Sequence, residues 1–257
     1  MAPTLPSGVT SPLSAPRQIG QASVKYADTH TGFLPTPGGY LLQILPYTEH
    51  NKVAEPLARS GKPWNDPVNA ELVARHLTIA QCPDAPDPDR LIGGKAAPTD
   101  YTACPTITLA IRDIFPVGYD LSTPLGGVGT PRGGMDEIAD GTSTTFLGIL
   151  EIADKPNRWQ AGKMMPAAKE GGGGGNGTWA ANGLNAPRGY SWDGKDFPGP
   201  CAMNCSNFAA VYSFHPDGCN FVFADGSVRF LRKEIDVWVF YAGLTRRGGE
   251  LLGASDF

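Results

Sequence analysis

Residues 213–230 read Ser-Phe-His-Pro-Asp-Gly-Cys-Asn-Phe-Val-Phe-Ala-Asp-Gly-Ser-Val-Arg-Phe and carry the clearest fold signal in the chain. Asp225-Gly226 lies between two runs of alternating apolar residues, which is the strongest short-range sign of a β-hairpin closed by a two-residue type I′ turn. Both turn residues need positive φ, which Asp tolerates and Gly adopts freely. We therefore predict that residues 220–224 and 227–231 form an antiparallel pair.

A two-residue turn also sets the register of the predicted hairpin. It places Phe223 opposite Val228 and Phe221 opposite Phe230. These four side chains then share one face, and Arg229 lies on the other. The hairpin is expected to have one buried face and one wetter face.

Helical and strand patterns elsewhere predict an α+β fold. The predicted helices cover residues 17–27, 67–77 and 237–244, the last with Asp236 as its N-cap. The predicted strands cover residues 105–111, 144–151, 209–215, 220–224 and 227–232. The 33 Gly and 24 Pro residues are well above average usage and indicate long loops, which we place at 115–140 and 160–200.

Composition excludes several classes of protein. The 257 residues are 41% hydrophobic, which is enough for a real core. No run of about 18 apolar residues occurs, so we expect no transmembrane segment. The net charge of −4 is spread along the chain, which does not suggest a nucleic-acid surface. Gly126-Gly127-Val128-Gly129 lacks the spacing of a dinucleotide-binding loop, so we expect no nucleotide.

Short motifs follow one another along the chain in a definite order. They are Gln18-Ile19-Gly20, Asp28-Thr29-His30, Leu45-Pro46-Tyr47, Cys82-Pro83-Asp84, Thr99-Asp100-Tyr101, Asp140-Gly141-Thr142-Ser143 with Glu151, Arg158-Trp159, Asn204-Cys205-Ser206-Asn207, and His215 followed after nine residues by Asp225-Gly226. In this order they resemble a large family of prepilin-like proteins abundant in planctomycetes. The family's C-terminal signature is the same His-(nine residues)-Asp-Gly pattern. Asp84 stands where the family's Cys-Pro-Ser-Asp block has Ser.

The resemblance implies a pilin-like fold, in which an N-terminal helix packs on an antiparallel sheet with long Gly/Pro-rich loop insertions. It implies a structural protein rather than an enzyme, located in the cell envelope or outside the cell. Such a subunit assembles with copies of itself or with other subunits of an envelope complex. Family members usually open with a basic leader and a long apolar helix, whereas residues 1–8 here are rich in Pro, Ser and Gly. We therefore expect residues 1–16 to form an extended arm that lies along a partner, and residues 17–257 to form the pilin-like domain.

The five cysteines suggest an oxidising compartment, in which two disulfides form and one thiol is left over. Cys82 and Cys104 are the expected loop-closing disulfide, and the partners of the other three stay open. A zinc site built from Cys201, Cys205 and Cys219 with His215 is the weaker interpretation, because the usual pairs of Cys two residues apart are missing.

His215, Asp225 and Gly226 are the signature residues, and we assign them a structural role. We expect His215 to be buried and bonded to the backbone or to a nearby side chain. A hydrolase centred on His215 is the second alternative, but it would need a nucleophile and an orienting acid that the sequence does not identify.

Two further interpretations involve ligands. Asp217 and Asp225, with carbonyl groups of the Gly-rich loop, could supply an oxygen cage for calcium, and no other cofactor is suggested. The first alternative to a structural role is an extracellular module that binds glycan or protein. It would use aromatic residues in and beside the second long loop, namely Trp159, Trp179, Tyr190 and Trp192.

Overall fold

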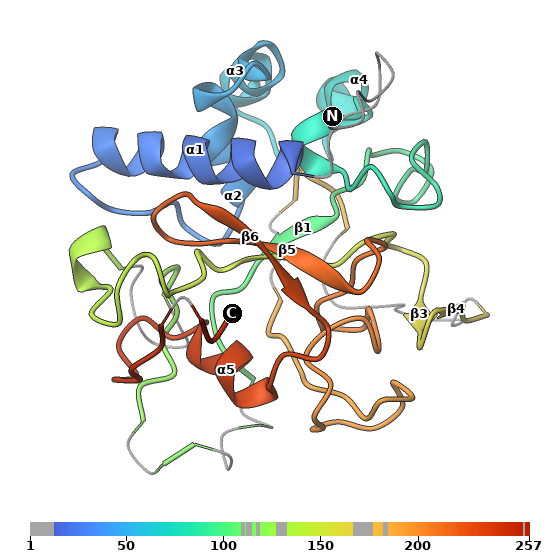
Figure 1. Ribbon diagram of the computed structural model, residues 1–257. Helices are drawn as coiled ribbons and strands as arrows, with labels where there is room; N and C mark the ends of the chain where they lie inside the picture. Colours follow the sequence, from blue (N-terminus) through green and yellow to red (C-terminus); the bar gives the residue numbers. More distant parts are fainter. Residues whose placement is uncertain are drawn as a thin grey trace, which may run out of the picture.

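Helix α1, Ser14–Thr29, lies across the C-terminal hairpin and covers one of its faces (Figure 1). This computed structural model describes residues 13–108, 111, 115–116, 119–126, 133–166, 177–181, 185–253 and 255–257. Ile19, Ala22 and Tyr26 are buried, as expected for residues three and four positions apart on one helix face. The predicted helix is confirmed.

The start of α1 changes the boundary predicted for the N-terminal arm. Residues 14–16 belong to the helix, and Ala15 and Pro16 are buried. The extended arm therefore stays a prediction for residues 1–12, which lie outside the described residues.

Strands β5, Gly218–Val222, and β6, Val228–Arg232, form an antiparallel pair, which confirms the predicted hairpin. The register differs from the prediction by one residue, because Val222 lies opposite Val228 and Phe221 opposite Arg229. Since the side-chain period of a strand is two, this difference moves residues of β6 to the other face.

The turn explains the difference in register. Gly226 N donates to Phe223 O (2.9 Å) and Phe223 N donates to Ser227 O (2.9 Å), so the loop has three residues. Gly226 has a φ of +83°, whereas Asp225 is not among the residues with positive φ. The hairpin thus closes with a type I turn and a left-handed glycine, not with the predicted type I′ turn.

The hairpin is buried on both faces of β5. Phe221 and Leu231 belong to the core cluster on one side. Val222 belongs to the cluster beneath α1 on the other side, and Val228 packs against it. Phe230, predicted to be in the core, is 46% exposed. The expectation of one buried and one wetter face was therefore wrong, because α1 covers the second face.

Two glycines allow α1 to approach the hairpin closely. A Cβ atom on Gly20 would lie 2.7 Å from Gly226 O and 3.0 Å from Val222 Cγ1. Distances under 3.0 Å to backbone are not tolerated without displacement of the helix. The second turn of α1 can therefore lie against the hairpin turn only because position 20 has no side chain.

Gly226→Val is expected to lower the free energy of unfolding by about 2 kcal/mol. A β-branched residue resists the φ of +83°, and its Cβ would lie 3.1 Å from Val24 Cγ2. Gly32→Val is the matched control, because Gly32 has the same φ and no neighbouring atom within 4 Å of its Cβ position. Urea unfolding should show the larger loss for Gly226→Val. A loss below about 1 kcal/mol would contradict the argument.

The other elements are short. They are helices α2 (Tyr40–Ile44), α3 (Asn51–Ser60), α4 (Ala70–Val73) and α5 (Val237–Ala242), 3-10 turns at Leu45–Tyr47, Pro67–Asn69, Thr78–Ala80 and Met135–Glu137, and strands β1 (Tyr101–Ala103), β2 (Ile149–Glu151), β3 (Trp159–Gln160) and β4 (Lys163–Met164). The strands form three separate antiparallel pairs, β1 with β2, β3 with β4 and β5 with β6. The chain between these elements runs in long loops (Figure 1).

Several predicted elements were too long. The helix predicted at 67–77 is a 3-10 turn followed by the single turn of α4. The strand predicted at 144–151 is reduced to β2. Residues 209–215 form only isolated bridges, and the described part of 105–111 forms one bridge but no strand. The helix predicted at 237–244 is confirmed as α5, and Asp236 caps it by accepting from Trp238 N.

The described helices include none that is both long and apolar enough to span a bilayer.

Candidate functional site

Cys82, Glu151 and His215 meet in the interior and form what we call the buried cluster. They are only 2%, 1% and 5% exposed. His215 Nε2 lies 3.7 Å from Cys82 Sγ and 3.7 Å from Glu151 Oε2. One atom from each of the three side chains lies within 4.8 Å of the others.

Three different segments deliver these side chains. Cys82 follows the 3-10 turn at Thr78–Ala80. Glu151 ends β2, where it pairs with Tyr101 of β1. His215 precedes β5, and its backbone N–H donates to Ser213 Oγ (3.1 Å). The cluster therefore connects the β1–β2 pair with the segment that leads into the β5–β6 hairpin.

Asp84 orients the imidazole of His215. Its Oδ2 lies 2.5 Å from His215 Nδ1, and this contact turns Nε2, the other ring nitrogen, towards Cys82 and Glu151. The Asp84 side chain is 40% exposed, which places this edge of the cluster near solvent. The expectation that His215 is buried and bonded to a nearby side chain is met by this contact.

Asp100 positions Cys82 from the other side. Its Oδ2 accepts from Cys82 N (2.8 Å), and its Oδ1 accepts from Asp154 N (2.8 Å) and from Arg90 Nη2. Arg90 is itself buried, and its Nε donates to Lys155 O (2.7 Å). Burial raises the pKa of Asp100, and the Arg90 guanidinium with the two backbone N–H groups opposes that rise.

Glu151 is the least satisfied member of the buried cluster. Among the described residues, none makes a hydrogen bond of good geometry to either carboxylate oxygen, although the Cys82 and Ser213 side chains lie close enough to influence its pKa. Burial raises the pKa of Glu151 to about 7, although the nearby His215, Cys82 and Ser213 side chains oppose the rise. Burial and the Glu151 charge raise the pKa of the Cys82 thiol well above its usual range.

These groups could support two kinds of chemistry. Asp84, His215 and Cys82 have the order of an acid, a base and a thiol nucleophile. However, a reactive thiol needs access and a lowered pKa, whereas Cys82 is buried and its pKa is raised. A ligand set for a metal fits the arrangement better.

The other signature residues lie at the far end of the hairpin. Asp225 Oδ1 accepts from Ser227 N (2.8 Å) and stabilises the turn, while His215 precedes the open end. The His-(nine residues)-Asp-Gly pattern thus has two roles. Its histidine belongs to the buried cluster, and its Asp-Gly forms the turn that contacts α1.

The predicted calcium ligands do not come together. Asp217 lies at the open end of the hairpin and Asp225 in its turn, so a five-residue strand of roughly 16 Å separates them. Asp217 instead pairs with Lys233 Nζ (2.9 Å). A cation held by both carboxylates is therefore ruled out by the length of β5.

The predicted disulfide was also wrong. Cys82 and Cys104 are free, buried thiols, whereas Cys201 and Cys205 form a disulfide. Cys82 faces His215, and Cys104 Sγ donates to Thr106 O (3.3 Å) within a different core cluster. The zinc site proposed from Cys201, Cys205, Cys219 and His215 is excluded as well, because a disulfide leaves two of its ligands unavailable.

Thiol counting should distinguish these assignments. Protein denatured without reductant is expected to show three reactive thiols, Cys82, Cys104 and Cys219, and two more after reduction. Alkylation followed by peptide mass spectrometry should place the two protected sulfurs at Cys201 and Cys205. Five reactive thiols before reduction, or protection of Cys82, would contradict the assignment.

The four aromatic residues expected to form a binding surface do not make an exposed platform. Trp179 and Tyr190 are buried, and Trp159 Nε1 donates to the buried Asp154 Oδ2 (2.7 Å). Of these four residues, Trp192 alone is largely exposed, at 57%. The binding-module alternative therefore loses most of the surface on which it rested.

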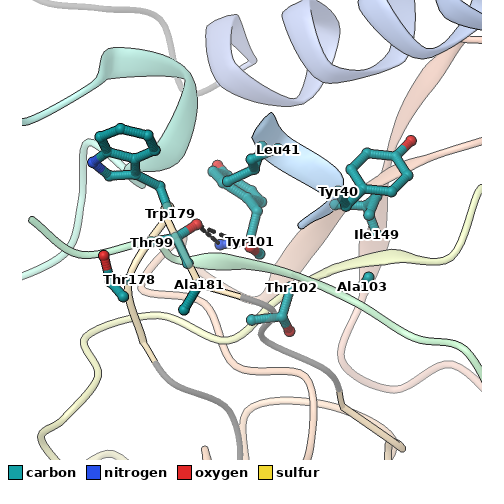
Figure 2. A pocket seen from close by; sticks show the side chains of 10 residues that line it. All are labelled: Tyr40, Leu41, Thr99, Tyr101, Thr102, Ala103, Ile149, Thr178, Trp179 and Ala181. Atoms are coloured by element: carbon teal, nitrogen blue, oxygen red, sulfur yellow. Dashed lines mark hydrogen bonds between the residues drawn. The ribbon is translucent and has the colours of Figure 1, made fainter. Parts of the chain in front are cut away.

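A small cavity lies where Trp179 meets α2 and β1 (Figure 2). Its volume of about 20 Å³ is close to that of a single water molecule. Tyr101, Thr99 and Trp179 are among the side chains that line it, and Tyr101 N donates to Thr99 Oγ1 (3.1 Å). This space is too small for a substrate.

The sequence motifs contained the three residues of the buried cluster and the two aspartates that position them, but spread over separate blocks. Cys82, Asp84, Asp100, Glu151 and His215 all lie in the motifs quoted above. Arg90 lies in none of them, and its one signal is a basic residue at the end of the Asp- and Pro-rich segment 83–90.

Comparison with known proteins identifies the family to which the chain belongs. A family model described as a protein of unknown function, DUF1559, matches residues 13–237. No curated protein and no solved structure matches the chain. The matched region contains α1, the buried cluster and the hairpin, and the chain belongs to the DUF1559 family.

Proposed function

We propose that this protein is a pilin-like structural subunit, located in the cell envelope or outside the cell, that assembles with copies of itself or with other envelope subunits. The observation that carries the proposal is the docking of α1 on the C-terminal hairpin. Gly20 and Gly226 make that contact, and both lie in motifs that resemble the prepilin-like proteins. An N-terminal helix held on an antiparallel pair is the arrangement that the resemblance implies.

The disulfide supports a location outside the cytoplasm. Cys201 and Cys205 are joined, and structural disulfides persist in oxidising compartments. An exported subunit therefore explains this bond better than a cytoplasmic enzyme does.

The surface of α1 indicates which part of the chain mediates assembly. Its outward face carries exposed polar residues, namely Arg17, Gln21 and Lys25, and such a face is suited to solvent rather than to an apolar partner. The segment that precedes α1 is the better candidate. We infer that residues 1–12 contact the neighbouring subunit.

Deletion of residues 1–12 tests this function. The deletion ends before the buried Ala15 and Pro16, so the domain should keep its fold. We expect sedimentation velocity and electron microscopy to show assemblies for the full chain and monomers for the deletion variant. Replacing residues 1–12 by a Gly/Ser segment of equal length controls for length alone. A full chain that stays monomeric at high concentration, or a deletion variant that assembles equally well, would refute the proposal.

A further inference from the structure

We propose that Cys82 Sγ, His215 Nε2 and the Glu151 carboxylate form a binding site for a Zn²⁺-type divalent transition-metal ion. Nε2 is 3.7 Å from the sulfur and 3.7 Å from Glu151 Oε2. Tetrahedral zinc, with bonds of about 2.0–2.3 Å, holds such ligand atoms about 3.4–3.6 Å apart. Shifts of a few tenths of an ångström bring these two ligands to that spacing around Nε2. The sulfur and the carboxylate lie within 4.8 Å of each other, so they would approach by up to about 1.2 Å when the ion binds.

The Glu151 carboxylate supplies an independent reason for a ligand. It is 1% exposed, and none of the described residues makes a hydrogen bond of good geometry to either oxygen, the nearest polar side chains being those of His215, Cys82 and Ser213. Buried polar groups are nearly always satisfied, and an exception calls for an unseen ion or water. A metal ion between Glu151 and His215 would satisfy this carboxylate.

Asp84 prepares His215 as a ligand. Metal-binding histidines commonly donate their second ring N–H to a carboxylate, which fixes the tautomer and the direction of the ring. The contact of Asp84 Oδ2 with His215 Nδ1 has this form. Asp100 positions Cys82, because its Oδ2 accepts a hydrogen bond from the backbone N–H of that residue (2.8 Å). Both are positioning residues.

The donor set selects the class of metal. A thiolate, a carboxylate and a neutral imidazole carry two negative charges together, which balance a divalent cation. Sulfur and imidazole ligands favour zinc and related transition metals over calcium and magnesium, which prefer oxygen. Three protein ligands leave a fourth position open to water. The partly exposed Asp84 marks the edge from which an ion could enter.

Binding would join three segments that only the fold brings together. Bound metal therefore stabilises the native state, because the unfolded chain does not hold these ligands in place. At a free metal concentration of about 100 times Kd, the midpoint of thermal unfolding should rise by roughly 5–10 °C.

Cobalt titration of the chelator-treated full chain, kept under argon, tests the proposal directly. We expect one Co²⁺ per chain, with a thiolate-to-cobalt charge-transfer band that Zn²⁺ abolishes by displacement. Asp84→Asn should weaken binding by about 10- to 100-fold and leave the stoichiometry unchanged. Cys82→Ser should remove the charge-transfer band, whereas Cys104→Ser, a change at another buried free thiol, should retain it.

The coordination shell keeps the proposal testable if Cys82→Ser fails to fold. X-ray absorption spectroscopy of the zinc-loaded wild-type chain should show one sulfur ligand, with nitrogen or oxygen at the other positions. No binding of cobalt or zinc by the folded chain, a shell with no sulfur or with two, or a band lost in Cys104→Ser would each overturn the assignment.

Discussion

Asp100→Ala is expected to lower the free energy of unfolding by about 3–5 kcal/mol, one of the two largest single effects that we predict. The change removes the main carboxylate partner of the buried Arg90. The carboxylate that remains is more distant, since Arg90 Nε is 3.7 Å from Asp154 Oδ1. It also removes the acceptor for two backbone N–H groups, those of Cys82 and Asp154. A buried charge that loses its main partner and two unsatisfied backbone donors each carry a cost. Chemical denaturation measured by circular dichroism gives the loss.

A double-mutant cycle separates the ion pair from the packing. Asp100→Asn combined with Arg90→Met removes both charges, so the pair should cost less than the sum of the two single changes by at least about 1 kcal/mol. Arg59→Ala is the control, because Arg59 and Glu55 form an exposed ion pair on α3 and such pairs contribute about 0.5 kcal/mol or less. Additive single changes, or an equal loss for Arg59→Ala, would contradict our account of the buried network.

Phe146→Ala should cost about 3–5 kcal/mol, because Phe146 is fully buried at the centre of an aromatic cluster. Its ring centroid lies 4.7 Å from that of Phe221, 5.2 Å from Phe223 and 5.4 Å from Phe257. The change leaves a cavity among residues that belong to the hairpin and the C-terminal end. Loss of packing there weakens contacts between segments distant in sequence.

Phe230→Ala provides the matched comparison for Phe146→Ala. Both changes delete the same ring, but Phe230 lies 46% exposed on β6. We expect a loss of about 1 kcal/mol or less for Phe230→Ala. Urea midpoints for the two variants should differ clearly. Similar losses would mean that Phe146 does not occupy the centre of the core.

The hairpin shows how far local signals reach. Asp225-Gly226 and the flanking apolar residues predicted its existence and position correctly, because turn chemistry is local. They did not predict its register. A type I′ turn and a type I turn followed by a left-handed glycine both place Gly at this position, so the local sequence does not distinguish them. The contact of Gly20 with Gly226 O occurs only in the folded chain.

The strands predicted at 105–111 and 209–215 failed for a related reason. Residues 209–213 are buried, as are Ile107 and Ile111 in the described part of 105–111, but isolated bridges and side chains bond backbone groups in or beside these segments in place of a regular ladder. Thr123 Oγ1 donates to Cys104 O (2.9 Å), and Ser213 N donates to Asn204 Oδ1 (2.8 Å). An alternating pattern reports burial, and it cannot distinguish a paired strand from an irregular buried segment.

The sequence by itself determined the amphipathic helix at the N-terminus, the hairpin at the C-terminus and the capped helix after Asp236, because each depends on neighbours a few residues away. Only the tertiary structure decided the cysteine pairing and the buried cluster. Cys82 and His215 are 133 residues apart in sequence, and no spacing rule relates residues so distant. Their meeting depends on the pairing of β1 with β2 and on the docking of the hairpin, since these long-range contacts bring the separate motifs to one place.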